Sequence, residues 1–284
     1  MGKRKRADSA TAPDDSSSDE SGVELPAVEK NKKWVNRQRV LVFASRGITY
    51  LHRHLMEDLR RILPHSKPET KKEKSAALTS INEICEMRNC NKCIYFEGRK
   101  KEDLYMWASS VPDGPSMKFL VENIHTLKEL KLTGNCLKGS RALLVFNKDF
   151  DSSPHLQLMK ELFVQLFGTP RYHPKSQPFI DHVLVFTFLD KKVWIRNYQI
   201  LEEKGALAEI GPRLVLNPIK IFQGSFCGQT IWENPHYISP NLLRRRLKEA
   251  RSLKYKGRVE QKKGHEARRP ETSYPTQPVD DIYS

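Results

Sequence analysis

The sequence of 284 residues lacks the features that membrane-spanning and secreted proteins use. It has no run of about 18 apolar residues, the length that crosses a bilayer, and the segment from Met1 to Arg6 has no apolar core of a secretory signal. Only five cysteines occur, an odd number in a long chain, which argues against a disulfide framework. We therefore expect a soluble intracellular protein with reduced thiols.

Motifs for familiar chemistry are missing as well. The chain has neither the phosphate-binding pattern Gly-x-x-x-x-Gly-Lys-Ser/Thr nor the nucleophile elbow Gly-x-Ser-x-Gly. His52 and His54 stand two positions apart on a predicted helix, so they point to different faces and are poorly placed to share a metal. We expect no catalytic residues, no cofactor and no enzymatic activity. An RNA-processing site without a recognisable motif stays open as an alternative.

The cysteines offer one chemical alternative. Cys85, Cys90 and Cys93, with Cys136 as a fourth ligand, have a spacing that could hold zinc or an iron-sulfur cluster. However, Cys85 falls on the apolar face of a predicted helix and Cys93 begins a predicted strand, where a free cysteine acts as a small buried hydrophobe. A single Cys-x-x-Cys pair is weak evidence, so we predict no metal site.

Positive charge is abundant. Lys and Arg number 49 against 34 Asp and Glu, which gives a formal net charge of +15 and indicates a polyanionic partner such as nucleic acid or an acidic membrane. Residues 1–33 are neutral overall, with seven basic and seven acidic side chains, and residues 241–284 carry +6. The remaining +9 lies on residues 34–240. The predicted folded body therefore shares the excess with the tail.

Residues 1–33 form a charged arm with few large apolar side chains, and we predict that it is disordered. The basic tetrad Lys3, Arg4, Lys5 and Arg6 fits a nuclear import signal, although it could also be only a solvated charge cluster. Ser16 to Ser18 lie among acidic residues and suit an acid-directed kinase.

The first part of the body reads as alternating strands and helices. We predict a buried strand at 40–43, helices at 48–63 and 78–85, and a hairpin formed by 93–96 and 104–107. We also predict a helix that opens after Gly114, with Pro115 in its first turn, and carries Phe119, Leu120, Ile124 and Leu127 inward.

The plan then repeats. Residues 142–146 resemble the first strand, Ser153-Pro154 opens a helix, and residues 182–189 and 193–201 form a hairpin. A short helical stretch at 205–210 and strands at 214–216 and 219–222 follow. The α/β fold class predicted from this order has two similar tandem lobes, each a small mixed sheet with helices, at about 39–135 and 140–230 of a domain spanning 34–240. Coincidence remains the alternative to duplication.

Basic residues stand beside glycine, proline or aromatic residues in several loops. The segments are 45–47, 138–141, 171–175 and 211–213. Positive side chains pair with phosphates, glycine lets backbone amides approach them, and aromatic rings stack on unpaired bases. The predicted RNA contacts, including a helical arginine and those of the tail, are Arg46, Gly47, Arg53, Lys138, Arg141, Arg171, Tyr172, Lys175, Arg213, Arg244, Arg245 and Arg246.

Four stretches resemble the Brix-domain family of ribosome assembly factors. The clearest runs from Gly211-Pro212-Arg213-Leu214-Val215-Leu216 to Ile221-Phe222-Gln223-Gly224-Ser225-Phe226, and the others are 43–47, 86–93 and 169–179. The resemblance covers about residues 39–240 and is greatest for large-subunit members. It implies a duplicated fold similar in each half to an anticodon-binding domain, a nucleolar location, binding of precursor ribosomal RNA without catalysis, and one dedicated protein partner.

Carried onto this chain, the resemblance makes Arg46, Arg141 and Arg213 the leading RNA contacts, with Gly47, Gly211 and Pro212 shaping their loops. Arg213 could instead be a buried arginine that ties the two lobes together. Relatives tend to have a longer basic tail, which leaves tail-dependent contacts in doubt.

The segment from Leu242 to Leu253 alternates leucines with basic residues and predicts an amphipathic basic helix, followed by a flexible tail to residue 284. It could lie in an RNA groove, pack on the body, or be a solvated helix end. The main functional hypothesis is a factor that binds precursor RNA of the large ribosomal subunit. The alternative is a protein-docking scaffold with only nonspecific attraction to RNA.

Overall fold

The computed structural model describes residues 38–73, 76–130, 134–201 and 205–268. The charged arm at 1–33, with its basic tetrad and serines, lies outside the described residues, as does the end of the tail at 269–284. None of the described helices combines the length and apolar character that crossing a membrane requires.

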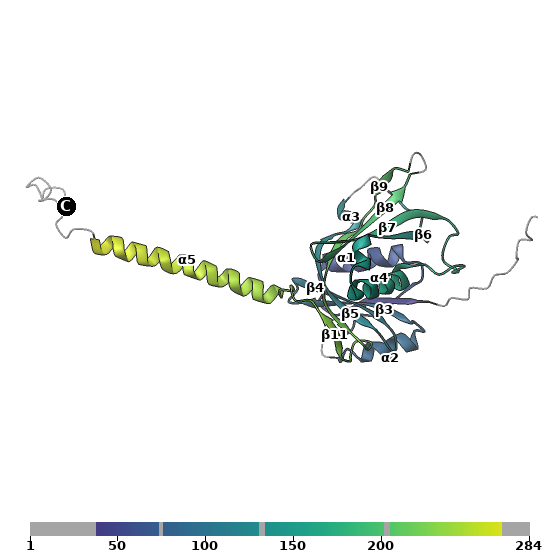
Figure 1. Ribbon diagram of the computed structural model, residues 1–284, viewed down its shortest axis with the longest axis horizontal. Coiled ribbons are helices and arrows are strands. Elements are labelled where there is room, and N and C mark those ends of the chain that lie inside the picture. The colour runs from purple at the N-terminus through teal and green to yellow at the C-terminus, as the bar shows by residue number, and fades with distance from the viewer. Residues whose placement is uncertain (1–37, 74–75, 131–133, 202–204, 269–284) are drawn as a thin grey trace, which may run out of the picture. The chain divides into compact units, whose positions relative to one another are not determined.

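The first half of the body follows the predicted order of strand, helix and hairpin (Figure 1). Its elements are β1 (Val40–Ala44), α1 (Tyr50–Ile62), β2 (Ser66–Pro68), α2 (Ser80–Met87), β3 (Lys92–Arg99), β4 (Asp103–Ser110), β5 (Ser116–His125) and the short α3 (Leu127–Leu130). Thr49 caps α1, since its side chain accepts a hydrogen bond from the backbone of His52.

The second half repeats this order and is followed by a short strand and a long helix. Its elements are β6 (Arg141–Phe146), the 3-10 helix η1 (Lys148–Asp151), α4 (Pro154–Phe167), β7 (Ile180–Leu189), β8 (Lys192–Ile200), β9 (Leu207–Glu209), β10 (Arg213–Phe222), β11 (Thr230–Glu233) and α5 (Pro240–Arg268). Pro154 opens α4 at a position that needs no amide donor, and Gly168 follows its end, as predicted.

All these strands belong to one mixed sheet. Its order is β2-β1-β3-β4-β5-β10-β8-β7-β6, with β11 beside β10 and β9 beside β8. In each half the first strand pairs in parallel with the strand that opens the hairpin, β1 with β3 and β6 with β7. The halves meet where β5 and β10 pair antiparallel. Each half has the expected order of elements, but the halves share one sheet rather than forming two separately packed lobes.

A single core also joins the halves. α1 and α4 lie between the two halves of the sheet (Figure 1), and both contribute to one large apolar cluster. Phe163 of α4 stacks on Phe119 of β5, with ring centroids 5.6 Å apart, and on Phe186 of β7 at 5.4 Å. Burial of such aromatic side chains contributes strongly to stability. The helix of the second half therefore packs on strands of both halves.

The predicted helix after Gly114 is wrong, because this segment is the strand β5. Met117, Phe119 and Val121 point into the core at every second position, and β5 pairs with β4 on one side and β10 on the other. Leu120, on the opposite face of β5, is apolar and buried as well. Because both faces carry apolar residues, the alternation typical of a strand was hidden and the segment was taken for a helix. Pro115 precedes a strand and not a helix.

Two smaller expectations are also corrected. The segment at 205–210 is not helical, because β9 pairs antiparallel with β8 after a turn closed by the Leu201 amide and the Ala206 carbonyl. The two last predicted strands are one strand, β10, whose pairing with β5 shifts register between Pro218 and Lys220. Pro218 lies inside this strand, where it cannot donate a hydrogen bond to the ladder, and the irregular pairing beside it is a bulge rather than a break.

Candidate nucleic-acid interface

Two of the predicted basic loops lie side by side. The amide of Gln177 donates to the carbonyl of Gly139 at 2.7 Å, and the amide of Arg141 donates to Phe179 at 3.2 Å. Gly139 has φ +83° and faces the Lys175 carbonyl so closely that a Cβ would stand 2.7 Å from its oxygen. This contact fixes the loop carrying Lys138 against the loop carrying Lys175.

The surface formed by these two loops carries exposed groups of the kind that bind RNA. Lys138, Arg171 and Lys175 are exposed, and Tyr172 presents 60% of its surface to solvent. Arg141 is different, because it is half-buried and its Nε has no hydrogen-bond partner among the described residues. The structure thus brings three predicted cations and one predicted stacking residue together.

Arg46 stands on a separate turn after β1. Its backbone amide donates to the Lys72 carbonyl at 2.8 Å, and Gly47 follows with φ +80°. The guanidinium pairs with Glu73 at 2.8 Å, but both side chains are more than half exposed. Because an exposed ion pair is weak, a phosphate could replace the carboxylate at little cost. Arg53 is exposed in the first turn of α1.

A cavity of about 420 Å³ lies beside the Arg46 turn. It is lined by Ser45, Glu97, Asp103 and Asn241 together with four basic residues that the sequence analysis did not single out: Lys72, Arg99, Lys100 and Lys118. Lys72 is mostly buried and donates to the carbonyls of Ala76 and Ala77, both at 2.7 Å. The three consecutive basic residues Arg99-Lys100-Lys101, at the end of β3 and in the turn after it, are the sequence signal that could have identified this region.

Glu97 organises the basic and aromatic residues along this cavity. Burial raises its pKa, but Lys118, Arg99 and the indole of Trp107 outweigh burial, so the pKa is lowered and the carboxylate stays charged. Lys118 Nζ lies 4.6 Å from the centroid of the Trp107 ring, a cation–π contact. Burial lowers the pKa of Lys118 despite this carboxylate. Lys118 thus has a structural role, whereas Lys100 is exposed.

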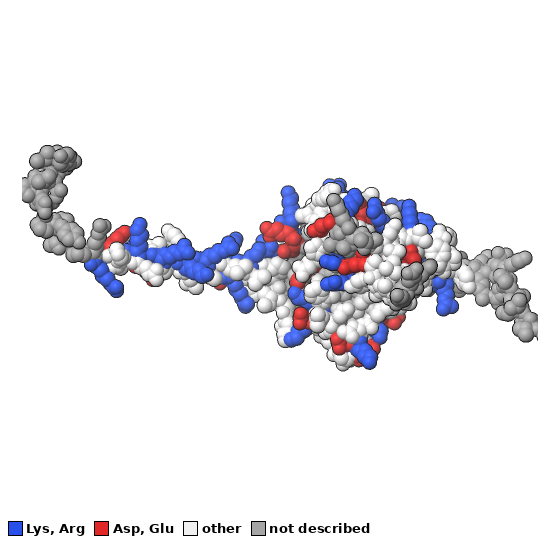
Figure 2. All heavy atoms as spheres, turned by 90° about the horizontal axis from the view of Figure 1, so that it is seen from above, with Lys and Arg blue, Asp and Glu red and all other residues white. Residues whose placement is uncertain are grey.

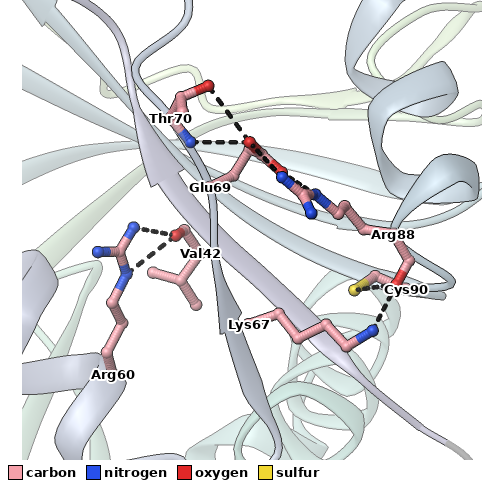
Figure 3. A network of polar contacts seen from close by, with 7 residues as sticks. All are labelled: Val42, Arg60, Lys67, Glu69, Thr70, Arg88 and Cys90. Carbon is pink, nitrogen blue, oxygen red and sulfur yellow. Dashed lines mark hydrogen bonds and ion pairs between the residues drawn. The ribbon is translucent and has the colours of Figure 1, made fainter.

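Other basic residues are bound within the fold (Figure 3). Arg60 donates through Nε and Nη2 to the Val42 carbonyl of β1, and Arg88 forms a two-point contact with Glu69. The contact with Arg88 lowers the pKa of Glu69 to about 2. Lys67 donates to the Arg88 carbonyl at 2.6 Å. Arg60 thus ties α1 to β1, and Arg88 ties the end of α2 to the segment after β2, so these side chains contribute less to an RNA surface than their charge suggests.

The arginine of the Gly211-Pro212-Arg213 motif is also engaged. Its guanidinium makes a two-point contact with Glu209 and is about one-third exposed. Asn197, which is fully buried, donates to the Gly211 carbonyl at 3.1 Å and so holds the motif from the neighbouring strand. Because Glu209 lies four residues earlier, in the same half, this ion pair does not tie the halves together. Arg213 as an RNA contact stays a prediction.

The strongest basic feature is α5, which confirms and extends the predicted basic helix. Its 29 residues include eleven Lys and Arg against three Asp and Glu, and none of them is buried. Figure 2 shows these basic side chains along the helix. Arg244 pairs with Glu102 in the turn between β3 and β4 and with Asp103 at the start of β4, and Arg245 pairs with Glu249. Arg246 is exposed.

Spacing places five of the eleven basic residues of α5 in one row along the helix. Positions separated by three or four residues lie above one another on a helix. One such row, here called the basic stripe, consists of Arg244, Lys248, Arg251, Tyr255, Arg258 and Lys262. Beyond Arg244, its cations form no ion pair with another described residue except Lys262, whose distance to Glu266 is 3.9 Å. The basic stripe extends along most of a helix about 43 Å long.

Metal-binding side chains are not clustered in the described part of the chain. No group of three or more His, Cys, Asp and Glu side chains in the described part of the chain could hold a metal ion. Cys85, Cys90 and Cys93 are buried free thiols, and burial raises the pKa of Cys90 to about 11. Asp181 and Ser140 both contact Nδ1 of His182, so these three residues do not form the relay of a catalytic triad.

Comparison with known proteins identifies the class. A model described as the Brix domain matches residues 45–220. Proteins named "Ribosome biogenesis protein BRX1 homolog" are 57% identical in Drosophila melanogaster and 58% identical in Homo sapiens, each over 261 residues. The alignments cover 91% of this chain and 73% and 74% of those proteins. The chain belongs to the Brix-domain family, and these relatives are ribosome biogenesis proteins.

A solved structure is also similar. It is that of a probable ribosomal biogenesis protein from Aeropyrum pernix K1, with a TM-score of 0.46 and 19% identity, and the alignment covers 63% of this chain and 96% of that chain.

Proposed function

We propose that this chain binds precursor ribosomal RNA during assembly of the large ribosomal subunit, and that it acts by binding alone. The observation that carries the proposal is the basic stripe of α5, whose cations beyond Arg244 are exposed and mostly without acidic partners. An exposed row of like charges destabilises a helix unless a polyanion neutralises it. The names of the relatives favour a ribosomal precursor as that polyanion.

The physical mechanism is phosphate neutralisation combined with base stacking. Lysines and arginines of the basic stripe pair with consecutive phosphates, which releases counterions and makes binding depend on salt. Tyr255 lies within the stripe and is 68% exposed, so its ring is available to an unpaired base. The loops carrying Lys138, Arg171 and Tyr172 supply a second contact region on the body. The turn at Arg46 is a third.

The finer architecture and setting belong to the same proposal. The repeated order of elements supports two duplicated units, each similar to an anticodon-binding domain, within a domain at 34–240. We propose a nuclear and nucleolar location, with Lys3, Arg4, Lys5 and Arg6 as import signal. We also propose one dedicated protein partner among the large-subunit assembly factors.

A salt titration with charge-reversed variants tests RNA binding. Replacing Arg251, Arg258 and Lys262 with Glu should weaken binding to a precursor ribosomal RNA fragment. The slope of log K against log salt should become shallower by about two to three units, measured by fluorescence anisotropy. The matched control exchanges Lys and Arg at the same three positions and should keep the slope. An unchanged slope in the Glu variant would remove α5 from the interface.

The body loops need their own variant. Replacing Arg46, Arg141 and Arg171 with Glu should weaken binding and flatten the salt dependence if these loops contact RNA. If only the α5 variant changes the slope, the helix alone carries the contact.

A protein-docking scaffold is the second candidate, since α5 also exposes Leu242, Leu243, Leu247 and Leu253. Crosslinking followed by sequencing of the bound RNA separates the two functions. Enrichment of one precursor region supports a specific RNA binder. A diffuse signal over all RNA supports the scaffold.

A further inference from the structure

A cavity of about 560 Å³, here called the junction cavity, lies where the two halves of the body meet. Its walls come from the end of α1 and the first residue of α3 in one half, from the segment 134–138 between the halves, and from β8 in the other half. Cavities of about 300–1,000 Å³ between packed units are the usual places for small ligands. The junction cavity therefore has the size and position of a binding site.

The inner wall of the junction cavity is apolar except for one amide. The buried residues among the described lining are Ile62, Ile210 and Asn197, with exposed fractions of 5%, 7% and 0%. Arg61 and Lys138 also line the cavity but are exposed. The three buried residues thus lie deepest, and the two cations stand at the rim.

Asn197 is held in place through every polar atom except one. Its Nδ2 donates to the Gly211 carbonyl at 3.1 Å, and its backbone carbonyl accepts from the Ile210 amide at 2.9 Å. Its Oδ1 is buried and has no hydrogen-bond partner among the described residues. A buried acceptor without a donor is unfavourable. The inner wall therefore favours a ligand that brings an N–H group.

Carboxylates fix the walls of the junction cavity without lining it. Asp58 accepts from the Leu127 amide at 2.9 Å, and Asp181 accepts from the Leu137 amide at 2.7 Å. No Asp or Glu is among the described lining residues. Because the lining includes two cations and no described carboxylate, the rim favours an anionic ligand. The ligand thus combines an anionic group at the rim with an apolar part that carries an N–H.

We propose that the junction cavity receives the base of one unpaired RNA nucleotide. An N–H of the base donates to Asn197 Oδ1, the ring packs on Ile62 and Ile210, and the phosphate pairs with Arg61 and Lys138. Each of the four bases has such an N–H group, so the site accepts a base without reading the sequence. This inference rests on the proposed function, because it names one subsite of the RNA contact.

The position of the junction cavity suits an RNA strand on the body loops. Lys138 stands at the rim and also on the surface of the two basic loops, with Arg171, Tyr172 and Lys175. A strand bound along that surface passes the rim, where one base can turn inward. This movement costs little for a base that is already unpaired. A free mononucleotide has the same chemistry and is distinguished by experiment.

Protection of Cys136 from alkylation reports whether the junction cavity is occupied. Cys136 lines the cavity, whereas Cys227 is exposed and does not line it. The full chain is treated with iodoacetamide, with or without adenosine 5′-monophosphate or a short oligoadenylate, and its peptides are analysed by mass spectrometry. At saturation both ligands should slow labelling of Cys136 by about tenfold and leave the rate at Cys227 unchanged. Inorganic phosphate, ribose 5-phosphate and an oligomer of the same length without bases should not protect Cys136.

The controls separate the cavity from the rest of the RNA contact. Equal protection by the oligomer without bases would overturn the proposal, because no base would then be needed. Protection by adenosine 5′-monophosphate but not by bound oligoadenylate would assign the site to a free nucleotide and also overturn it. Fluorescence anisotropy of the same oligoadenylate at low salt measures RNA binding itself. Binding without protection of Cys136 contradicts only the cavity, whereas no binding contradicts the proposed function as well.

Arg61 offers a matched pair of variants at the rim. Arg61→Glu should weaken protection by adenosine 5′-monophosphate about tenfold in apparent affinity, because it places a carboxylate beside the phosphate. Arg61→Lys keeps the charge and should keep most of the protection. Lys138→Glu, on an exposed loop, makes the same test from the other side of the rim, and thermal unfolding checks that each variant folds. Unchanged protection in both Glu variants would show that the phosphate is not held there and would overturn the proposal.

Discussion

The two halves of the sheet use nearly the same strand sequence in opposite surroundings. Val40-Leu41-Val42-Phe43-Ala44 forms β1 and Ala142-Leu143-Leu144-Val145-Phe146 forms most of β6, and in both strands alternate residues enter the shared core. The other residues are fully covered in β1 and nearly half exposed in β6. An apolar strand run therefore does not reveal whether both of its faces are buried within the same chain.

The largest difference between the halves should appear in stability. Leu41→Ala removes side-chain atoms from a sealed cluster and should lower the free energy of unfolding by about 3 kcal/mol. Leu143→Ala makes the same chemical change on the open face and should cost less than about 1 kcal/mol. Urea denaturation of the two variants measures both values. Equal losses would show that the outer side of β6, which carries Leu143, is covered in the isolated protein.

The contact between the halves should be sensitive to acid. His65 bonds to the Leu166 carbonyl at the end of α4, and burial lowers its pKa from 6.5 to about 4. Because the folded pKa lies below the unfolded value, the unfolded state binds the proton more readily. Stability present above pH 6.5 is lost as the pH falls toward 4. Between pH 7 and pH 5 we expect a loss of about 2 kcal/mol from this residue.

The control for this prediction is His65→Gln, which keeps a donor for the Leu166 carbonyl without a titrating group. Its stability should fall less steeply over the same pH interval, measured by thermal unfolding at each pH. Parallel pH profiles for the two proteins would mean that His65 titrates alike in the folded and unfolded states.

The smallest effect concerns thiol labelling, which leaves the sequence unchanged. Cys85, Cys90 and Cys93 lie beneath or within the α2 cover, whereas Cys227 is exposed and Cys136 is half-buried. Iodoacetamide at mildly alkaline pH should label Cys227 first, Cys136 more slowly, and the other three only when α2 opens. Mass spectrometry of the peptides gives the order, and labelling in denaturant provides the reference. Simultaneous labelling of Cys93 and Cys227 would contradict the cover.

Local signals in the sequence predicted much of the fold. Helix α4 follows from Pro154, Gly168 and the apolar row between them, and the hairpins follow from alternating runs around polar turns. β5 could not be recognised in this way, because both of its faces are apolar and the burial of Leu120 against Ile219 depends on a strand about 100 residues later. The single sheet depends on the same distant pairing.

The sequence predicted that the candidate site is basic, but it predicted the positions and partners of only some of its residues. A run of basic residues identified α5, because charge spacing on a helix is local. The partners of Arg213 and Arg244 could not be deduced, since they depend on where β9 ends and on how the hairpin of β3 and β4 meets the start of α5. Lys72 and Lys100 were missed for the same reason, because the cavity that they line forms from distant segments.

The position of β10 has a consequence for the order in which the protein can form. This strand lies at the middle of the sheet, between β5 and β8, yet it consists of residues 213–222 of 284. During synthesis the earlier strands emerge first and can pair only within their own halves, because their bridge has not yet been made. The two parts of the sheet are joined only once β10 has left the ribosome, so a chain interrupted before residue 213 contains both halves but no sheet that unites them.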